Sequence, residues 1–111
     1  MFYHAYCVYC KRGQENKLIR ILQKIAPSCR VIRPAKRKKI MRDGNTSELA
    51  QSLCPRYLFL YSNEAIGKVL HDKYLPGIEY WLGDKDNDYE LLDADLVLAQ
   101  ALYACNGIFD E

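Results

Sequence analysis

The cysteines are the first residues of this chain that could do chemistry. Cys7 and Cys10 stand at the C-x-x-C spacing of redox and metal sites. The surrounding segment, residues 2–10, is dense in Tyr, Val and Cys and predicts a strand, on which residues three apart point to opposite faces. No second C-x-x-C or Cys/His pair completes a zinc site. We therefore predict two buried small residues and no cofactor. The odd total of five cysteines favours free thiols in a reducing compartment.

An acidic segment is the second candidate. Residues 84–95 place acids at positions 1, 3, 5, 7, 10 and 12 of a calcium-loop pattern. Position 6, which must be Gly, is Tyr89, and position 12, which should be a bidentate Glu, is Asp95. The segment before it also has the pattern of a strand and not of a helix. We therefore predict an acidic loop that leads into a helix, not a metal site.

Catalytic patterns are scarce. The two histidines, His4 and His71, have no Ser or Cys partner in a recognisable arrangement, and the chain has no Gly-rich phosphate-binding loop. We expect a protein that is not an enzyme. An active site assembled only by tertiary contacts stays open as an alternative.

Length and composition predict one cytoplasmic domain. At 111 residues the chain can close a single core. No apolar run approaches the roughly 18 to 20 residues that span a bilayer, so no membrane partner is expected. The N-terminus lacks the basic start and long apolar core of an export signal. Charge is uneven, because seven basic residues and no acid occur in residues 30–42, while six acids and one lysine occur in residues 84–95.

The hydrophobic pattern predicts four strands and three helices. This order is typical of an α+β fold, a mostly antiparallel four-stranded sheet with about three helices packed against it. The predicted strands are residues 2–10, 29–33, 57–61 and 78–82, with 78–82 as the last strand of the chain. The predicted helices are residues 14–26, 64–73 and 93–106.

Two of the helices carry predicted caps and core residues. We expect Ser62 or Asn63 to cap the second helix and Asp93 to cap the third. The residues expected to face the core are Ile66, Val69 and Leu70 in the second helix, and Leu96, Val97, Leu98, Ala101, Leu102 and Cys105 in the third.

The strand at residues 57–61 is the one around which the chain is organised. Pro55 fits only the start of a strand, because it has no N–H to donate. By alternation, Leu58 and Leu60 should enter the core. The phenols of Tyr57 and Tyr61 are candidates to reach the surface, and Pro55, Tyr57 and Phe59 are expected to shape a face left open for a protein partner.

The basic run predicts a projecting hairpin or a mobile loop over residues 36–52, with Asp43-Gly44-Asn45 as its turn. Two interpretations stay open, a solvated charged loop or a contact with nucleic-acid phosphates. The residues proposed for such a contact are Lys36, Arg37, Lys38 and Lys39.

Three segments resemble the N-terminal domain of NusG-type transcription elongation factors. Residues 5–15 (AYCVYCKRGQE) are similar to the aromatic strand and glycine turn that open this domain, and residues 9–14 (YCKRGQ) resemble specialised paralogues of the RfaH or LoaP type. Residues 54–60 (CPRYLFL) are similar to the family's Phe-Pro-Gly-Tyr-Val strand, and residues 76–83 (PGIEYWLG) to its later Gly-Val-x-x-Phe-x-Gly segment. The resemblance implies one domain of this type over residues 1–111.

This resemblance implies a factor that binds bacterial RNA polymerase during elongation and suppresses pausing or termination. Its apolar patch would bind the coiled-coil tip of the polymerase clamp, and another side would face the non-template DNA strand. Carried over by position, the patch is Tyr9, Cys54, Pro55 and Tyr57, and the residues facing DNA are Lys11, Arg12 and Lys17. The alternatives are a freestanding nucleic-acid-binding α+β domain and a small redox or hydrolytic enzyme.

Three departures separate the chain from its relatives. Cys54 stands where the family usually has Phe, which removes a ring from the patch. Residues 67–70 (GKVL) stand where RfaH-type proteins have a His-Thr-Thr-Thr segment for a second polymerase contact. The C-terminal KOW barrel of NusG proteins is absent from this chain, so contacts with the ribosome or with termination factor Rho are expected only if the full protein carries that barrel.

Overall fold

The computed structural model describes residues 2–42, 45–52 and 56–110, with the backbone alone for 36–42, 45–52 and 109–110. Four strands form the main sheet in the order β2-β5-β1-β6, and each neighbouring pair is antiparallel. The predicted α+β fold with a four-stranded antiparallel sheet is confirmed, and β5 lies inside the sheet. The bounds are β1 His4–Cys10, β2 Arg30–Ile32, β5 Tyr57–Ser62 and β6 Ile78–Trp81.

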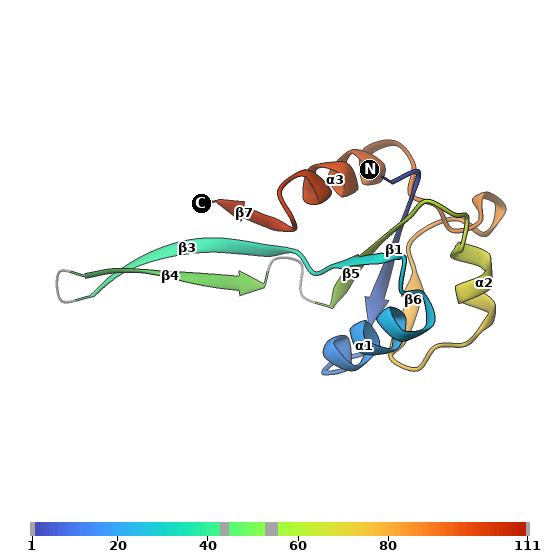
Figure 1. Cartoon of the computed structure of the whole chain (residues 1–111), viewed down its shortest axis with the longest axis horizontal. Helices are drawn as coiled ribbons and strands as arrows, with labels where there is room; N and C mark the ends of the chain where they lie inside the picture. Colours follow the sequence, from blue (N-terminus) through green and yellow to red (C-terminus); the bar gives the residue numbers. More distant parts are fainter. Residues whose placement is uncertain (1, 43–44, 53–55, 111) are drawn as a thin grey trace.

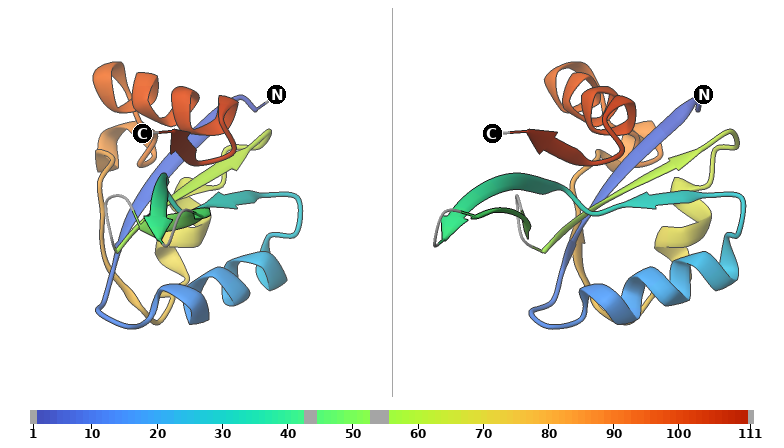
Figure 2. Two further views of the ribbon diagram at one scale, coloured as in Figure 1. Left: turned by 90° about the vertical axis from the view of Figure 1, so that its left-hand side faces the viewer. Right: turned by 60° about the vertical axis from the view of Figure 1, so that its left-hand side comes forward.

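Three α-helices cover the two faces of this sheet. α1 (Glu15–Ile25) and α2 (Gly67–Asp72) lie on one face, and α3 (Asp93–Ala104) lies on the other (Figure 2). α1 matches the predicted helix to within one residue at each end, because Leu18 and Leu22 form a buried stripe. None of the described helices is long and apolar enough to cross a bilayer.

Strand β5 buries both of its faces. Leu58 and Leu60 are fully buried in the cluster beneath α1 and α2, as predicted. Phe59 and Tyr61 are 6% and 1% exposed in the cluster beneath α3. Of the two candidate phenols, Tyr61 therefore does not reach the surface, whereas Tyr57 is half-buried, and Phe59 contributes to a cavity wall and not to an exposed face. The reason is α3, a helix distant in sequence, which covers this side of β5 from Phe59 onward.

A long hairpin projects from the body (Figure 1). β3 (Ala35–Arg42) pairs with β4 (Asn45–Ser52) over their whole length, and the molecule measures 53 Å along its longest axis. The hairpin interpretation of residues 36–52 is thus confirmed, while Asp43 and Gly44 of the predicted turn lie outside the described residues.

A further strand, β7 (Ile108–Asp110), follows α3 and pairs in parallel with β3. The prediction that the strand at 78–82 is the last one is therefore wrong. Three residues are too few for an alternating pattern to be recognised in the sequence. They form a strand because they pair with β3. The second sheet has the order β4-β3-β7.

The second helix is shorter than predicted. α2 starts at Gly67, because the Ser62 hydroxyl accepts the Glu64 backbone N–H at 3.0 Å and so closes a turn instead of capping a helix. Leu70 is buried as predicted, but Val69 is 57% exposed. A helix of six residues has room for few core positions, and the buried ones are Gly67 and Leu70.

The third helix buries a different stripe from the one predicted. Leu102 is buried as predicted and Leu96 and Cys105 are half-buried, but the other fully buried residue is Ala99. Leu92 occupies the N-cap position, with Asp93 as the first helical residue and no side-chain capping bond. The apolar residues of this helix occur on nearly every side, so the sequence does not select one face. Three predicted core residues are exposed: Val97, Leu98 and Ala101.

Removing the Tyr61 hydroxyl should lower the free energy of unfolding by about 1 kcal/mol, the net contribution of one buried hydrogen bond. This hydroxyl donates to the Ala99 carbonyl oxygen in α3 at 2.7 Å. We expect Tyr61→Phe to lower the urea midpoint at an unchanged slope. Tyr3→Phe is the matched control, because the Tyr3 side chain is 78% exposed. Equal midpoints for both variants would contradict the anchoring of α3 by this bond.

Candidate functional site

Three tyrosines from three neighbouring strands form a row across one end of the sheet, which we call the tyrosine row. Tyr9 of β1 pairs with Tyr57 of β5 on one side and with Tyr80 of β6 on the other. The centre of the Tyr9 ring lies 4.8 Å from that of Tyr57 and 4.9 Å from that of Tyr80. The hydroxyls of Tyr57 and Tyr80 are 3.4 Å apart.

The tyrosine row lies where α3 stops covering the sheet. In the adjacent row, Cys7 and Phe59 are buried, whereas Tyr9 and Tyr57 are half-buried and Tyr80 is 47% exposed. Cross-strand aromatic contacts hold such rings in place. The row therefore presents ordered aromatic rings at the surface of the sheet.

Arg56 supports the row from its edge. Its guanidinium carbon lies 4.4 Å from the centre of the Tyr9 ring, a cation–π contact. Its Nε donates to the Cys10 carbonyl oxygen at 2.9 Å, and its Nη2 donates to the Glu79 carboxylate at 2.6 Å. Arg56 thus ties the ends of β1, β5 and β6 together and restricts the Tyr9 ring before any partner binds.

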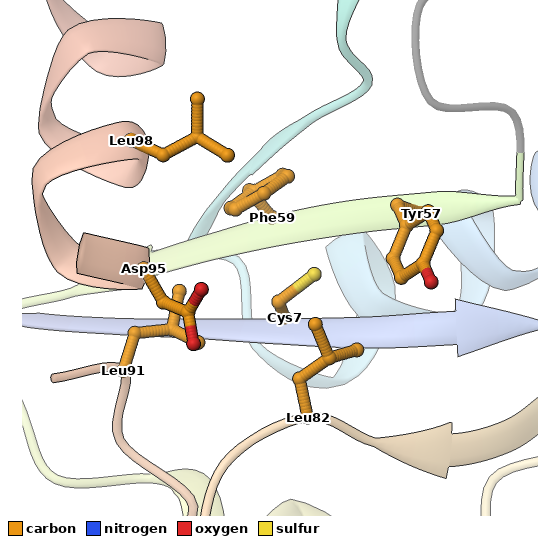
Figure 3. Close-up of a pocket in the computed structure, with 7 residues that line it drawn as sticks. All are labelled: Cys7, Tyr57, Phe59, Leu82, Leu91, Asp95 and Leu98. Carbon is orange, nitrogen blue, oxygen red and sulfur yellow. The ribbon is translucent and has the colours of Figure 1, made fainter.

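An apolar cavity of about 160 Å³ adjoins the row (Figure 3). Tyr57 forms one of its walls, and Leu82 and Leu98 at its rim are 38% and 43% exposed. The acidic residue among those that line the cavity is Asp95, which is exposed. A cavity of this kind suits an apolar side chain of a protein partner. The other lining residues are Cys7, Phe59 and Leu91.

Sequence reasoning found part of this site. Tyr9 and Tyr57 come together as the predicted patch requires, while Cys54 and Pro55 lie outside the described residues. Tyr80, Arg56 and the cavity were missed. Alternation along residues 80–82 places Tyr80 and Leu82 on one face, but only the pairing of β6 with β1 places that face beside Tyr9.

The predicted nucleic-acid-binding residues fall in two places. Lys11 and Arg12 are exposed in the turn after β1, and Lys17 is exposed on α1. Arg33, just before β3, donates to the Asn16 side chain of α1 at 2.9 Å. The base of the hairpin is therefore linked to the first turn of α1. The residues Lys36, Arg37, Lys38 and Lys39 lie on β3 opposite residues 48–51 of β4, and their side chains are outside the described part of the structure.

The C-x-x-C pair lies on opposite faces of β1, as predicted. Cys10 belongs to the cluster beneath α1 and α2, and Cys7 to the cluster beneath α3. Burial raises the pKa of the Cys10 and Cys29 thiols to about 11, so both are protonated at neutral pH. Within the described ranges, no group of three or more His, Cys, Asp or Glu side chains is arranged to hold a metal ion.

Within the tyrosine row, the Tyr57 hydroxyl has a perturbed pKa. Pairing with the Tyr80 hydroxyl, together with desolvation, raises the pKa of Tyr57 from 10.0 to about 12. Because the pKa is higher in the folded state, this pairing stabilises the fold fully below about pH 10 and loses its effect as the pH rises through about 12.

Tyr80→Phe should therefore lower the pKa of Tyr57 towards its ordinary value, because the hydroxyl partner is lost. Carbon NMR of ring-labelled tyrosine against pH measures this pKa directly. Tyr74→Phe, a change in a side chain that is 92% exposed, should leave it unchanged. An unaltered pKa of Tyr57 in Tyr80→Phe would contradict the pairing.

The sequence matches no known protein-family model and no curated protein. The functional interpretation of the tyrosine row therefore depends on the geometry of this chain and on the resemblance of its three motifs.

Proposed function

We propose that this chain is a non-enzymatic transcription elongation or antitermination factor of the NusG type. It binds the coiled coil of the RNA polymerase clamp through the tyrosine row and the adjoining cavity, and it suppresses pausing or termination. The observation that carries the proposal is the open end of an otherwise covered sheet, where Tyr9 and Tyr57 stand together beside an apolar hollow.

The tyrosine row has the properties of a protein-binding hot spot. Aromatic side chains dominate such sites because they bury a large area at a small cost in conformational entropy. Contacts with Arg56, Tyr57 and Tyr80 already restrict the Tyr9 ring. Binding a partner therefore costs this side chain little further conformational entropy. A helical tip could place one apolar side chain in the cavity while its flanks cover the rings.

The charges suit a nucleic acid next to this patch. Lys11 follows β1 only two residues after Tyr9, so exposed cations begin where the tyrosine row ends. Twelve of the sixteen basic residues lie in residues 11–42, with Glu15 as the single acid among them. Cations act on the backbone of single-stranded DNA and need no base contacts. A protein bound to the clamp by the patch would thus hold this region towards the non-template strand.

The mechanism we infer is mechanical. A domain that contacts both the clamp and the DNA braces the clamp in its closed position and so opposes the rearrangements that lead to pausing. It acts in the cytoplasm. Coupling to the ribosome or to Rho belongs to this function only if the full protein carries a KOW barrel.

Leu98→Glu should weaken the capture of core RNA polymerase by about 30-fold, because a carboxylate forced into an apolar contact costs at least about 2 kcal/mol. Leu98 lines the cavity and is 43% exposed, so the free protein tolerates the change. Affinity is measured by titrating labelled protein with polymerase.

Val97→Glu is the matched control for this experiment. Val97 is the neighbouring residue on α3, is 65% exposed and does not line the cavity. Equal loss in both variants, or no loss in Leu98→Glu, would refute the assignment of the cavity. A wild-type protein that binds DNA but no polymerase would replace this proposal with that of a freestanding nucleic-acid-binding domain.

Charge reversal at Lys11 and Arg12 should weaken pause suppression without abolishing polymerase capture. The affinity for the elongation complex should also depend less steeply on salt, by about one unit of log–log slope for each phosphate that is no longer neutralised. Pause lifetimes measure the first effect, and titration of the labelled protein with elongation complex at several KCl concentrations measures the second. Reversal of Lys68 and Lys73, which are exposed on and just after α2, is the control. Unchanged pausing at low salt would argue against a DNA-facing role for this turn.

A further inference from the structure

A second hollow, of about 390 Å³, runs between the end of α2 and β6, away from the cavity beside α3. All four residues of β6, Ile78–Trp81, line it. Successive residues of a strand point to opposite faces, so a hollow that touches four in a row follows the edge of the strand. Strand β6 is the terminal strand of the main sheet, and among the described strands it pairs only with β1. Its other edge is therefore free to pair.

Aromatic rings form the outer wall of this hollow. His71 stacks on Tyr89 with ring centres 4.2 Å apart and an angle of 14° between the planes. The Trp81 ring lies 5.7 Å from Tyr89 and 6.1 Å from His71. Tyr74, in the segment that leads from α2 back to β6 (Figure 1), is 92% exposed. Ring faces of this kind bind either a flat base or an organic cation.

The charge around the hollow decides between these two ligands. Residues 67–95 contain eight acids and three lysines. A neighbouring hollow of about 350 Å³ shares His71 and Tyr89, and its charged lining consists of Asp72, Asp86 and Asp88 with two lysines. This local excess of negative charge repels phosphates and attracts cations. The basic residues that suit nucleic acid are concentrated in residues 11–42 instead.

We propose that the free edge of β6 binds an extended, arginine-bearing segment of a protein partner. The backbone of that segment adds a strand to the sheet beside β6, and its arginine side chain enters the aromatic hollow between Tyr74 and Trp81. The arginine is recognised by the ring faces and attracted by the aspartates of the neighbouring hollow, while Glu79, the carboxylate that lines the hollow itself, is paired with Arg56. This site adjoins the polymerase-binding surface proposed above, with Tyr80 common to the two, but its arginine-binding rings, Tyr74 and Trp81, lie outside the tyrosine row, so it stands whether or not that function is correct.

The test is a titration of the full chain with a capped peptide of alternating threonine and valine that carries one central arginine. Trp81 is the sole tryptophan, so its fluorescence reports on the hollow directly. We expect a saturable change with this peptide. Replacing the arginine by citrulline, which has the same shape without the charge, should weaken binding at least about threefold. N-methylation of every peptide amide should abolish binding, because neither edge of such a peptide can donate a backbone hydrogen bond to β6.

Two variants complete the test. Tyr74→Ala should weaken arginine-peptide binding at least about threefold, and it leaves the fold intact because the side chain is exposed. Tyr3→Ala, at a side chain that is also largely exposed but lies outside the hollow, should bind like the wild type. The proposal is overturned if no peptide binds, if citrulline binds as tightly as arginine, or if Tyr74→Ala has no effect. It is also overturned if oligothymidylate changes Trp81 fluorescence in preference to the peptide.

Discussion

The antiparallel pairing of β1 with β5 is the constraint on which the rest of the structure depends. It extends from His4↔Ser62 to Tyr9↔Tyr57, and it fixes which residues share a row across the sheet. Once this register is set, alternation sends Leu58 and Leu60 beneath α1 and α2, and Phe59 and Tyr61 beneath α3. A slip of one residue would exchange the two sets. The tyrosine row exists only because this register, continued to β6, brings three tyrosines from distant segments into line.

The coverage of the sheet determines where a partner can bind. α1 and α2 cover one face, and α3 covers the other except at the end where the tyrosine row lies. The uncovered part is small, ordered by Arg56 and joined to an apolar cavity. The charges are separated in the same way, with basic residues from the turn after β1 to the hairpin and acids around α2 and β6. A small domain thereby presents surfaces of different chemistry on different sides.

The sequence predicts the α+β fold because its strands and α1 carry clear periodic patterns. It also singles out Tyr57 as a phenol in an apolar strand, but the same argument points to Tyr61, which is buried. Tyr9 is found only through the resemblance to NusG-type proteins. The sequence misses Tyr80 and Arg56, because their roles depend on strand register and on a turn between strands, which local patterns do not encode. It wrongly assigns Val97 and Leu98 to the core, because α3 is apolar on nearly every side. Tertiary packing alone selects Ala99 and Leu102 for burial. It omits β7 because three residues gain strand structure only by pairing with β3.

The measurement that tests the central claim most directly is NMR of the labelled chain mixed with the isolated coiled-coil fragment of a bacterial RNA polymerase clamp. The account predicts that ring signals of Tyr9, Tyr57 and Tyr80 and the methyl signals of Leu82 and Leu98 shift together and saturate, while Leu18 and Leu22 of α1 stay unchanged. Shifts confined to the α1 and α2 face, or no shifts at saturating fragment, would contradict it.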